Sequence, residues 1–191
     1  MLAIARERFA ADGLDRASYN RIIAAAGISK TSAYQYFDGR ADLLDAVVSD
    51  VTERASLALG PWQRAADSAA FWSQLNDGAS RLFGHLTLHP DDRVLLGDRS
   101  AVLDAVGSWF DAIVANAIEL GLIRSNLDPD LLLAATGKLF EAIDGWALQQ
   151  LGEAASAPAH DVDLSDAWRM LATVWGTPAV LAPGAERAIS D

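Results

Sequence analysis

The feature that most constrains the fold is the spacing of apolar residues, which recur every three or four positions along almost the whole chain. This is the repeat of an α-helix with one buried face, whereas a half-buried strand alternates every two residues. Sustained alternation and internal repeats are both absent from the sequence. With 191 residues, 51% of them apolar, the chain can bury a sizeable core. We therefore expect an all-α protein of about nine helices.

The first fifty residues predict a group of short helices. One apolar stripe ends at Gly13, and Ser18 is a favourable N-cap for a second helix that ends at Gly27. Ser29 can cap a short third helix, and Asp38 or Gly39 opens a fourth. The expected inner face of that fourth helix consists of Leu44, Val47, Val48 and Val51.

Beyond Gly60-Pro61 the sequence predicts longer helices. One apolar stripe stops at His89-Pro90, a second covers residues 102–121, and Asp128-Pro129 is typical of an N-cap followed by a proline at the first helical position. Residues 152–163 are expected to form a loop, and residues 164–175 a last helix. We predict two domains, a helix-bundle domain over residues 51–191 and a smaller one over residues 1–50.

The charge is distributed unevenly between these two parts. The net charge of −11 argues against a nucleic-acid partner only if it is spread over the whole surface. Residues 1–44 contain six basic and five acidic groups, so they carry +1, which leaves −12 for the remainder. All six tryptophans also lie beyond residue 44. The near-neutral N-terminal part can therefore present one basic face.

Several functional classes are disfavoured by what the sequence lacks. The absence of cysteine excludes disulfides, thiolate metal sites and cysteine nucleophiles. No apolar run approaches the roughly 20 residues that cross a bilayer, and the first residues lack the layout of a secretory signal, so we expect a cytoplasmic protein without a membrane partner. Neither a Gly-rich phosphate loop nor a nucleophile elbow is present, which argues against an enzyme and a cofactor. His85 and His89 share a helix face, but no third ligand is placed nearby, so no metal site is expected.

Residues 18–37 carry the functional prediction. A helix ends at a glycine, the three-residue turn Gly27-Ile28-Ser29 follows, and a short helix begins, which is the spacing of a DNA-binding helix-turn-helix. At 100° per residue, Ala33 faces inward and Thr31 and Gln35 lie on the opposite side. Glutamine can pair with adenine, and threonine can contact a thymine methyl group. Turn geometry alone leaves a plain structural helix pair about equally open, with the nearby tyrosines as packing residues.

Residues 5–51 resemble the N-terminal domain of the TetR family of repressors. The family pattern is close to Ile-Ala-x-Ala-Ala-Gly-Val-Ser-Lys-x-x-x-Tyr-x-Tyr-Phe, and this chain matches it in register from Ile22 to Phe37, followed by Arg40 and Leu43-Leu44. Ala33 and Ile23 depart from the usual residue sizes. The resemblance implies that the chain contacts double-stranded DNA through Ser29, Lys30, Thr31, Ser32, Tyr34, Gln35, Tyr36 and Arg40.

The resemblance also implies a homodimer that reads an inverted repeat. The last two long helices, over residues 128–151 and 164–176, would pack against their dimer mates as a four-helix bundle. Trp146, Trp168 and Trp175 would be anchors of this interface. An intramolecular core position is about equally open for these three side chains.

A small-molecule effector is the third expected partner. Helical domains of this kind enclose an apolar cavity with a few polar groups. The candidate contacts are Trp72, Phe83, His85, Trp109, Phe110, Phe140 and Asp144. Each is individually more typical of core than of a pocket, so only two or three are expected to line a cavity. The resulting hypothesis is a repressor that an effector releases from DNA. The alternative is a helical ligand-binding or protein-interaction module whose helix-turn-helix does not read DNA.

Overall fold

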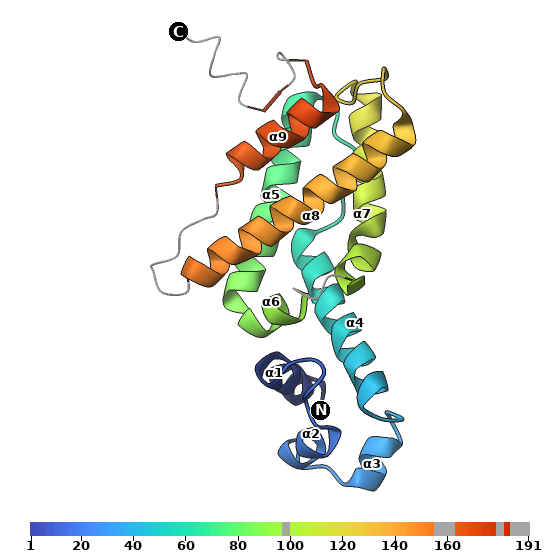
Figure 1. Cartoon of the computed structure of the whole chain (residues 1–191), viewed down its shortest axis with the longest axis vertical. Coiled ribbons are helices and arrows are strands. Elements are labelled where there is room, and N and C mark those ends of the chain that lie inside the picture. Colours follow the sequence, from blue (N-terminus) through green and yellow to red (C-terminus); the bar gives the residue numbers. More distant parts are fainter. Residues whose placement is uncertain (97–99, 155–162, 179–181, 184–191) are drawn as a thin grey trace. The chain divides into compact units, whose positions relative to one another are not determined.

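The structure, a computed structural model, describes residues 1–96, 100–154, 163–178 and 182–183 (Figure 1). Over these residues the chain forms nine α-helices and no strand, which confirms the all-α prediction. The helices are α1 (Leu2–Asp12), α2 (Tyr19–Ala25), α3 (Lys30–Tyr34), α4 (Arg40–Leu59), α5 (Ser68–Leu88), α6 (Pro90–Leu96), α7 (Ser100–Glu119), α8 (Pro129–Ala154) and α9 (Ser165–Trp175). None of the helices in the described part is long and apolar enough to cross a membrane.

These helices belong to two compact units. The first unit comprises Met1–Ala58 and His85–Val106, and the second comprises Leu59–Gly84 and Gly107–Asp191. In the structure, α4 and α6 thus group with the N-terminal helices. The predicted division into residues 1–50 and 51–191 stays a prediction.

The short helices of the first unit begin and end close to the residues that the sequence indicates. α1 ends at Gly13, which has φ 88° and donates its backbone N–H to the carbonyl of Phe9. Ser18 is the N-cap of α2, although its side chain makes no capping hydrogen bond. Ser29 caps α3, because its Oγ accepts a hydrogen bond of 3.0 Å from the backbone N–H of Ser32.

The buried face of α4 begins at Leu43, one residue before the Leu44 that was predicted. Leu43, Val47 and Val51 are fully buried, whereas Leu44 and Val48 are half-buried. Residues four apart differ by only about 40° around a helix, so the first three form one stripe, and the other two lie about 100° further round. The pair of adjacent leucines does not reveal which one faces the core.

Helix α6 was not predicted from the sequence. Its first residue is Pro90, and Asp91 and Asp92 occupy its first turn, which are two signals of a helix start. The apolar stripe before it stops at the same proline, and a proline ends one helix as readily as it begins another. α6 packs against α1 within the first unit, as α2 also does.

The second unit is built around buried aromatic side chains of α5 and α9. Trp175 is fully buried, and its Nε1 donates a hydrogen bond of 3.0 Å to Oγ1 of Thr136. Nε1 of Trp168 likewise donates to Oδ1 of Asn76. Trp168 and Trp175 are thus intramolecular core residues, which corrects their expected role as dimer anchors. Each indole finds its hydrogen-bond partner inside the chain, as a buried indole requires.

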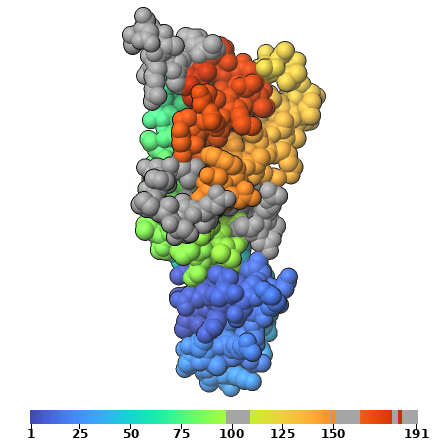
Figure 2. All heavy atoms as spheres, turned by 60° about the vertical axis from the view of Figure 1, so that its left-hand side comes forward, coloured from blue at the N-terminus to red at the C-terminus, as the bar shows by residue number. Residues whose placement is uncertain are grey.

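α8 and α9 pack against each other and lie side by side at the surface (Figures 1 and 2). The expected loop at residues 152–163 begins later than predicted, because α8 continues to Ala154, and residues 155–162 lie outside the described residues. The predicted last helix agrees with α9 to within one residue. Trp146 of α8 is 42% exposed, unlike the two buried tryptophans of α9.

Asn116 of α7 fixes the segment that follows α4. Its side chain is buried, Oδ1 accepts hydrogen bonds from the backbone N–H of Ala65 (2.7 Å) and from Nε1 of Trp62 (3.2 Å), and Nδ2 donates to the carbonyl of Ala65. A single buried amide therefore satisfies three polar groups of an irregular segment.

Candidate nucleic-acid interface

The helix-turn-helix rests on a small apolar core within the first unit. Phe9, Ile22 and Ala33 are fully buried and come from three different helices. Gly27 makes the turn with φ 65°, a conformation that only glycine adopts without strain. α3 therefore packs against α2 with its buried side, and its other side presents polar groups.

The outer side of α3 carries the residues that the sequence assigned to DNA. Thr31 and Gln35 are exposed, opposite the buried Ala33, as the helical spacing predicts. Tyr36 is 76% exposed and Tyr34 is 53% exposed. Lys30 is exposed at the first position of α3. The structure brings these five side chains together on one short helix and the residues that follow it.

The two serines of the predicted set are engaged within the helix. Ser29 Oγ accepts from the backbone of Ser32, and the two hydroxyl groups lie 2.9 Å apart. A serine that caps a helix N-terminus satisfies one of its free backbone N–H groups. Both residues thus set the start of α3, whatever else they contact.

Arg40 occupies a structural position at the start of α4. Its Nε donates a hydrogen bond of 3.0 Å to the carbonyl of Ala17, and its guanidinium lies 5.8 Å from the ring centre of Phe9. These contacts tie α4 to the loop between α1 and α2. A phosphate contact by Arg40 stays a prediction, but loss of this side chain would also disturb the domain.

Tyr19 is a positioning residue that the sequence analysis missed. Its hydroxyl donates a hydrogen bond of 3.0 Å to the carbonyl of Phe37, and its ring meets that of Tyr34 edge to face. Burial, and then the neighbouring Tyr34, raises the pKa of Tyr19 above its ordinary value. The side chain therefore stays protonated and keeps the end of α3 in place. The first position of a helix, directly after the N-cap, gave no sign of this contact.

The candidate effector residues fall into separate groups. Trp72 meets Phe71 edge to face and lies tilted against Trp175, Phe83 is buried, and Trp109 meets Trp62 edge to face. His85 is hydrogen-bonded to Asp92 of α6 within the first unit.

Two of the candidates form a contact between α7 and α8. Phe110 and Phe140 meet edge to face with ring centres 5.6 Å apart, and Asp144 lies one turn further along α8. Asp144 is half-buried, and this burial raises the pKa of its carboxyl to about 6. The structure thus brings Phe110 and Phe140 into contact, with Asp144 one helical turn from Phe140.

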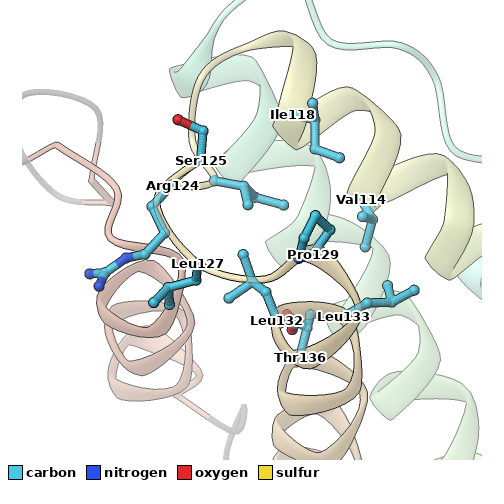
Figure 3. A pocket seen from close by; sticks show the side chains of 10 residues that line it. Val114, Ile118, Arg124, Ser125, Leu127, Pro129, Leu132, Leu133 and Thr136 are labelled. Carbon is cyan, nitrogen blue, oxygen red and sulfur yellow. The ribbon is translucent and has the colours of Figure 1, made fainter.

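A cavity of about 240 Å³ lies where α7 turns into α8 (Figure 3). Its lining is mainly aliphatic, and it consists of Val114, Ile118, Ile123, Arg124, Ser125, Leu127, Pro129, Leu132, Leu133 and Thr136. The side chain of Arg124 points away from it (Figure 3) and lies against Gly176. None of the seven candidate effector residues lines this cavity.

In the parts of the chain that the structure describes, no three acidic or histidine side chains are arranged to hold a metal ion. His85 and His89 do stack, with ring centres 4.5 Å apart, but Asp92 is the only acidic side chain bonded to them among the described residues.

Comparison with known proteins agrees with this geometry. The family described as "Bacterial regulatory proteins, tetR family" matches residues 1–47. Comparison with curated proteins gives no match. A crystal structure of a candidate transcriptional regulator from Streptomyces coelicolor shares the fold with a TM-score of 0.55 and 24% sequence identity, over 95% of this chain and 96% of that one. The helix-turn-helix and the family match over it show that residues 1–47 are similar to bacterial regulatory proteins of the tetR family, and the all-α fold over the described residues agrees with this similarity.

Proposed function

We propose that the chain is a homodimeric, sequence-specific repressor that a small-molecule effector releases from its operator. The observation that carries this proposal is the outer side of α3, where Thr31 and Gln35 are exposed directly opposite a fully buried Ala33. A helix with a fixed inner side and a polar outer side fits the major groove, where base edges are read by hydrogen bonds.

The roles of individual residues follow from their positions on α3 and next to its ends. Gln35 and Thr31 are proposed to contact bases, and Tyr34 and Tyr36 to reach phosphates with their hydroxyl groups. Lys30 is proposed as a phosphate contact, because it is an exposed cation at the start of the helix. Ser29, Ser32 and Arg40 are proposed to approach the backbone of the DNA as well as to stabilise the domain.

The proposal is tested by selecting binders from a pool of random DNA duplexes at low salt. We expect an inverted repeat to be enriched. Gln35→Ala should then lower the binding preference for one base in each half-site by about 1–3 kcal/mol, because a glutamine–base contact is lost. Lys30→Ala should weaken binding to all DNA sequences alike. It should also reduce the steepness of log affinity against log salt concentration by about 1. Arg40→Ala is unsuitable as the phosphate variant, because its hydrogen bond to Ala17 would be lost too.

Failure of the selection would favour the alternative function. If no sequence is enriched and the native protein, Gln35→Ala and Lys30→Ala bind equally poorly, the helix-turn-helix does not read DNA. The chain would then be a helical ligand-binding or protein-interaction module.

The proposed dimer is supported by the surface of α8 and α9. Leu131 is 64% exposed on α8, and Met170 is 56% exposed on α9, on neighbouring helices of the second unit. Large apolar side chains exposed on two helices that pack against each other can form a protein–protein contact. Two-fold symmetry would also match the protein to an inverted repeat.

The proposed effector contact is best supported at Phe110, Phe140 and Asp144. The two rings meet at the contact of α7 with α8, and a half-buried carboxyl lies one helical turn away. A screen by quenching of tryptophan fluorescence would identify binders. By linkage, an effector that weakens DNA binding must itself bind more weakly, by the same factor, to the DNA-bound protein. A binder that leaves DNA affinity unchanged would not be an effector.

A further inference from the structure

Asp92 is a fully buried carboxylate that lies among three basic side chains. Its Oδ2 lies 2.8 Å from Nε2 of His85 and 3.1 Å from Nη2 of Arg54, and its Oδ1 lies 3.5 Å from Nε of Arg6. These residues come from α1, α4, α5 and α6, and all belong to the first unit. We refer to Arg6, Arg54, His85 and Asp92 as the Asp92 cluster.

The cluster connects the helix-turn-helix to α6. α1 contributes Phe9 to the core beneath α3, and Arg6 lies on the same helix less than one turn away. Asp92 is in the first turn of α6, which packs against α1. A buried carboxylate needs compensating charge and hydrogen bonds, so Asp92 favours the arrangement in which α1, α4 and α6 remain together.

The contact with α1 is the weakest of the three. Oδ2 of Asp92 is hydrogen-bonded to His85, whereas Oδ1 of Asp92 and Nε of Arg6 are both buried without a hydrogen-bond partner. Arg6 is also 3.7 Å from Oδ2 of Asp50 on α4, a second carboxylate to which it can turn. The ion pair between Arg6 and Asp92 is therefore the one that breaks first when the charge of the cluster changes.

His85 is the imidazole of the cluster, and an imidazole can be neutral or carry one positive charge. Asp92 from α6 and His89, which directly follows α5, contact His85 itself. Arg54 from α4 and Arg6 from α1 lie on the other side of Asp92, and Asp50 from α4 pairs with Arg6. With His85 neutral, two arginines balance two carboxylates. Protonation of His85 adds a third cation that shares Oδ2 of Asp92 with Arg54.

We propose that the Asp92 cluster is a proton-responsive joint, in which protonation of His85 draws Asp92 toward the imidazolium, weakens its ion pair with Arg6 and loosens α1 from α6. The DNA-binding consequence rests on the proposed function, because a loosened α1 holds α3 less firmly and lowers operator affinity on acidification. The loosening of α1 itself does not depend on DNA. Asp92 thus positions α1, and protonation of His85 makes this positioning depend on pH.

The first test measures amide hydrogen exchange of the full chain at about pH 6 and about pH 8, with rates corrected for the intrinsic effect of pH. In the native protein the protection of α1 should fall at the lower pH by about tenfold, a modest value for coupling between sites. His85→Gln keeps an N–H donor for Asp92 but cannot be protonated, so its α1 should be equally protected at both values. His89→Gln is the matched control and should behave like the native protein.

A second variant covers the case in which His85→Gln does not fold. Arg6→Gln removes the α1 side of the joint, so α1 should be weakly protected at both pH values. Equal loss of protection in native and His85→Gln protein on acidification would overturn the proposal, as would a native α1 whose protection does not change.

Operator affinity is then measured over the same pH range at constant salt. The affinity of the native protein should fall, relative to His85→Gln, by about tenfold at the lower pH. If no duplex is bound at any pH, the proposed function fails and the exchange experiment still decides the joint. If the native protein and His85→Gln bind DNA with the same pH profile, the Asp92 cluster does not control operator affinity. The repressor proposal then still stands.

Discussion

Asp144 is an acidic side chain in an otherwise apolar stretch of α8, between the buried Ile143 and the exposed Trp146. Burial raises the pKa of its carboxyl from 3.8 to about 6. Between these two values the folded protein binds more protons than the unfolded chain does, so the free energy of unfolding falls as the pH rises through this window. At neutral pH the charged carboxylate therefore opposes folding.

Asp144→Asn should remove this penalty, because the amide cannot ionise. We expect the variant to be more stable than the native protein by about 1–3 kcal/mol at about pH 8, and the difference to vanish as the pH approaches about 4. Urea unfolding across this range measures the effect. Asp111→Asn, at an exposed position of α7, is the control and should show no such pH dependence. A constant difference between Asp144→Asn and the native protein at every pH would contradict the assignment to ionisation.

At the scale of single elements, the turn between α2 and α3 depends on the backbone of one glycine. Gly27 and Gly39 both lie in the helix-turn-helix region, and a Cβ added at either would meet no atom within 4 Å. They differ in conformation, since Gly27 has φ 65° and Gly39 does not have a positive φ. The pair therefore separates backbone strain from crowding.

Gly27→Ala should lower the free energy of unfolding by about 1–2 kcal/mol, which is the cost of a left-handed conformation for an L-residue. Gly39→Ala should be neutral or stabilise by up to about 1 kcal/mol, because alanine restricts the unfolded chain. Urea denaturation of both variants measures the difference. Equal effects of the two substitutions would show that backbone conformation is not what selects glycine at position 27.

At the scale of the whole molecule, the proposed dimer makes DNA affinity depend on a surface far along the sequence from α3. Replacing both Leu131 and Met170 by glutamate places charges on the proposed contact face of α8 and α9. We expect sedimentation to show a monomer, and operator affinity to fall at least about 100-fold, because a monomer holds only one half-site. The fold should be unchanged, since both side chains are more than half exposed.

Leu57→Glu is the control for this double variant. Leu57 is 74% exposed on α4, so it tests the effect of charge at an exposed apolar position elsewhere. This protein should remain dimeric and bind DNA like the native one. A double variant that stays dimeric would mean that another surface, or none, joins the two copies.

The sequence alone predicts much of the local structure. Gly13, Ser29 and Asp128 mark helix ends where the structure has them, because capping depends on a few neighbouring residues. The same holds for the inward position of Ala33 and the outward positions of Thr31 and Gln35, which follow from helical periodicity. The family resemblance over the helix-turn-helix rests on this same local pattern and is confirmed.

What the tertiary structure decided is which distant side chains meet. Three hydrogen bonds could not be inferred from the sequence, because each joins different elements of the fold. They are those of Arg40 to the carbonyl of Ala17, of Tyr19 to the carbonyl of Phe37, and of His85 to Asp92. The same applies to Trp168 and Trp175, whose hydrogen bonds to Asn76 and Thr136 place them in the core. Periodicity specifies the buried side of a helix but not its neighbour. A buried polar group is stable only beside the right partner, and that partner exists only once the helices have packed.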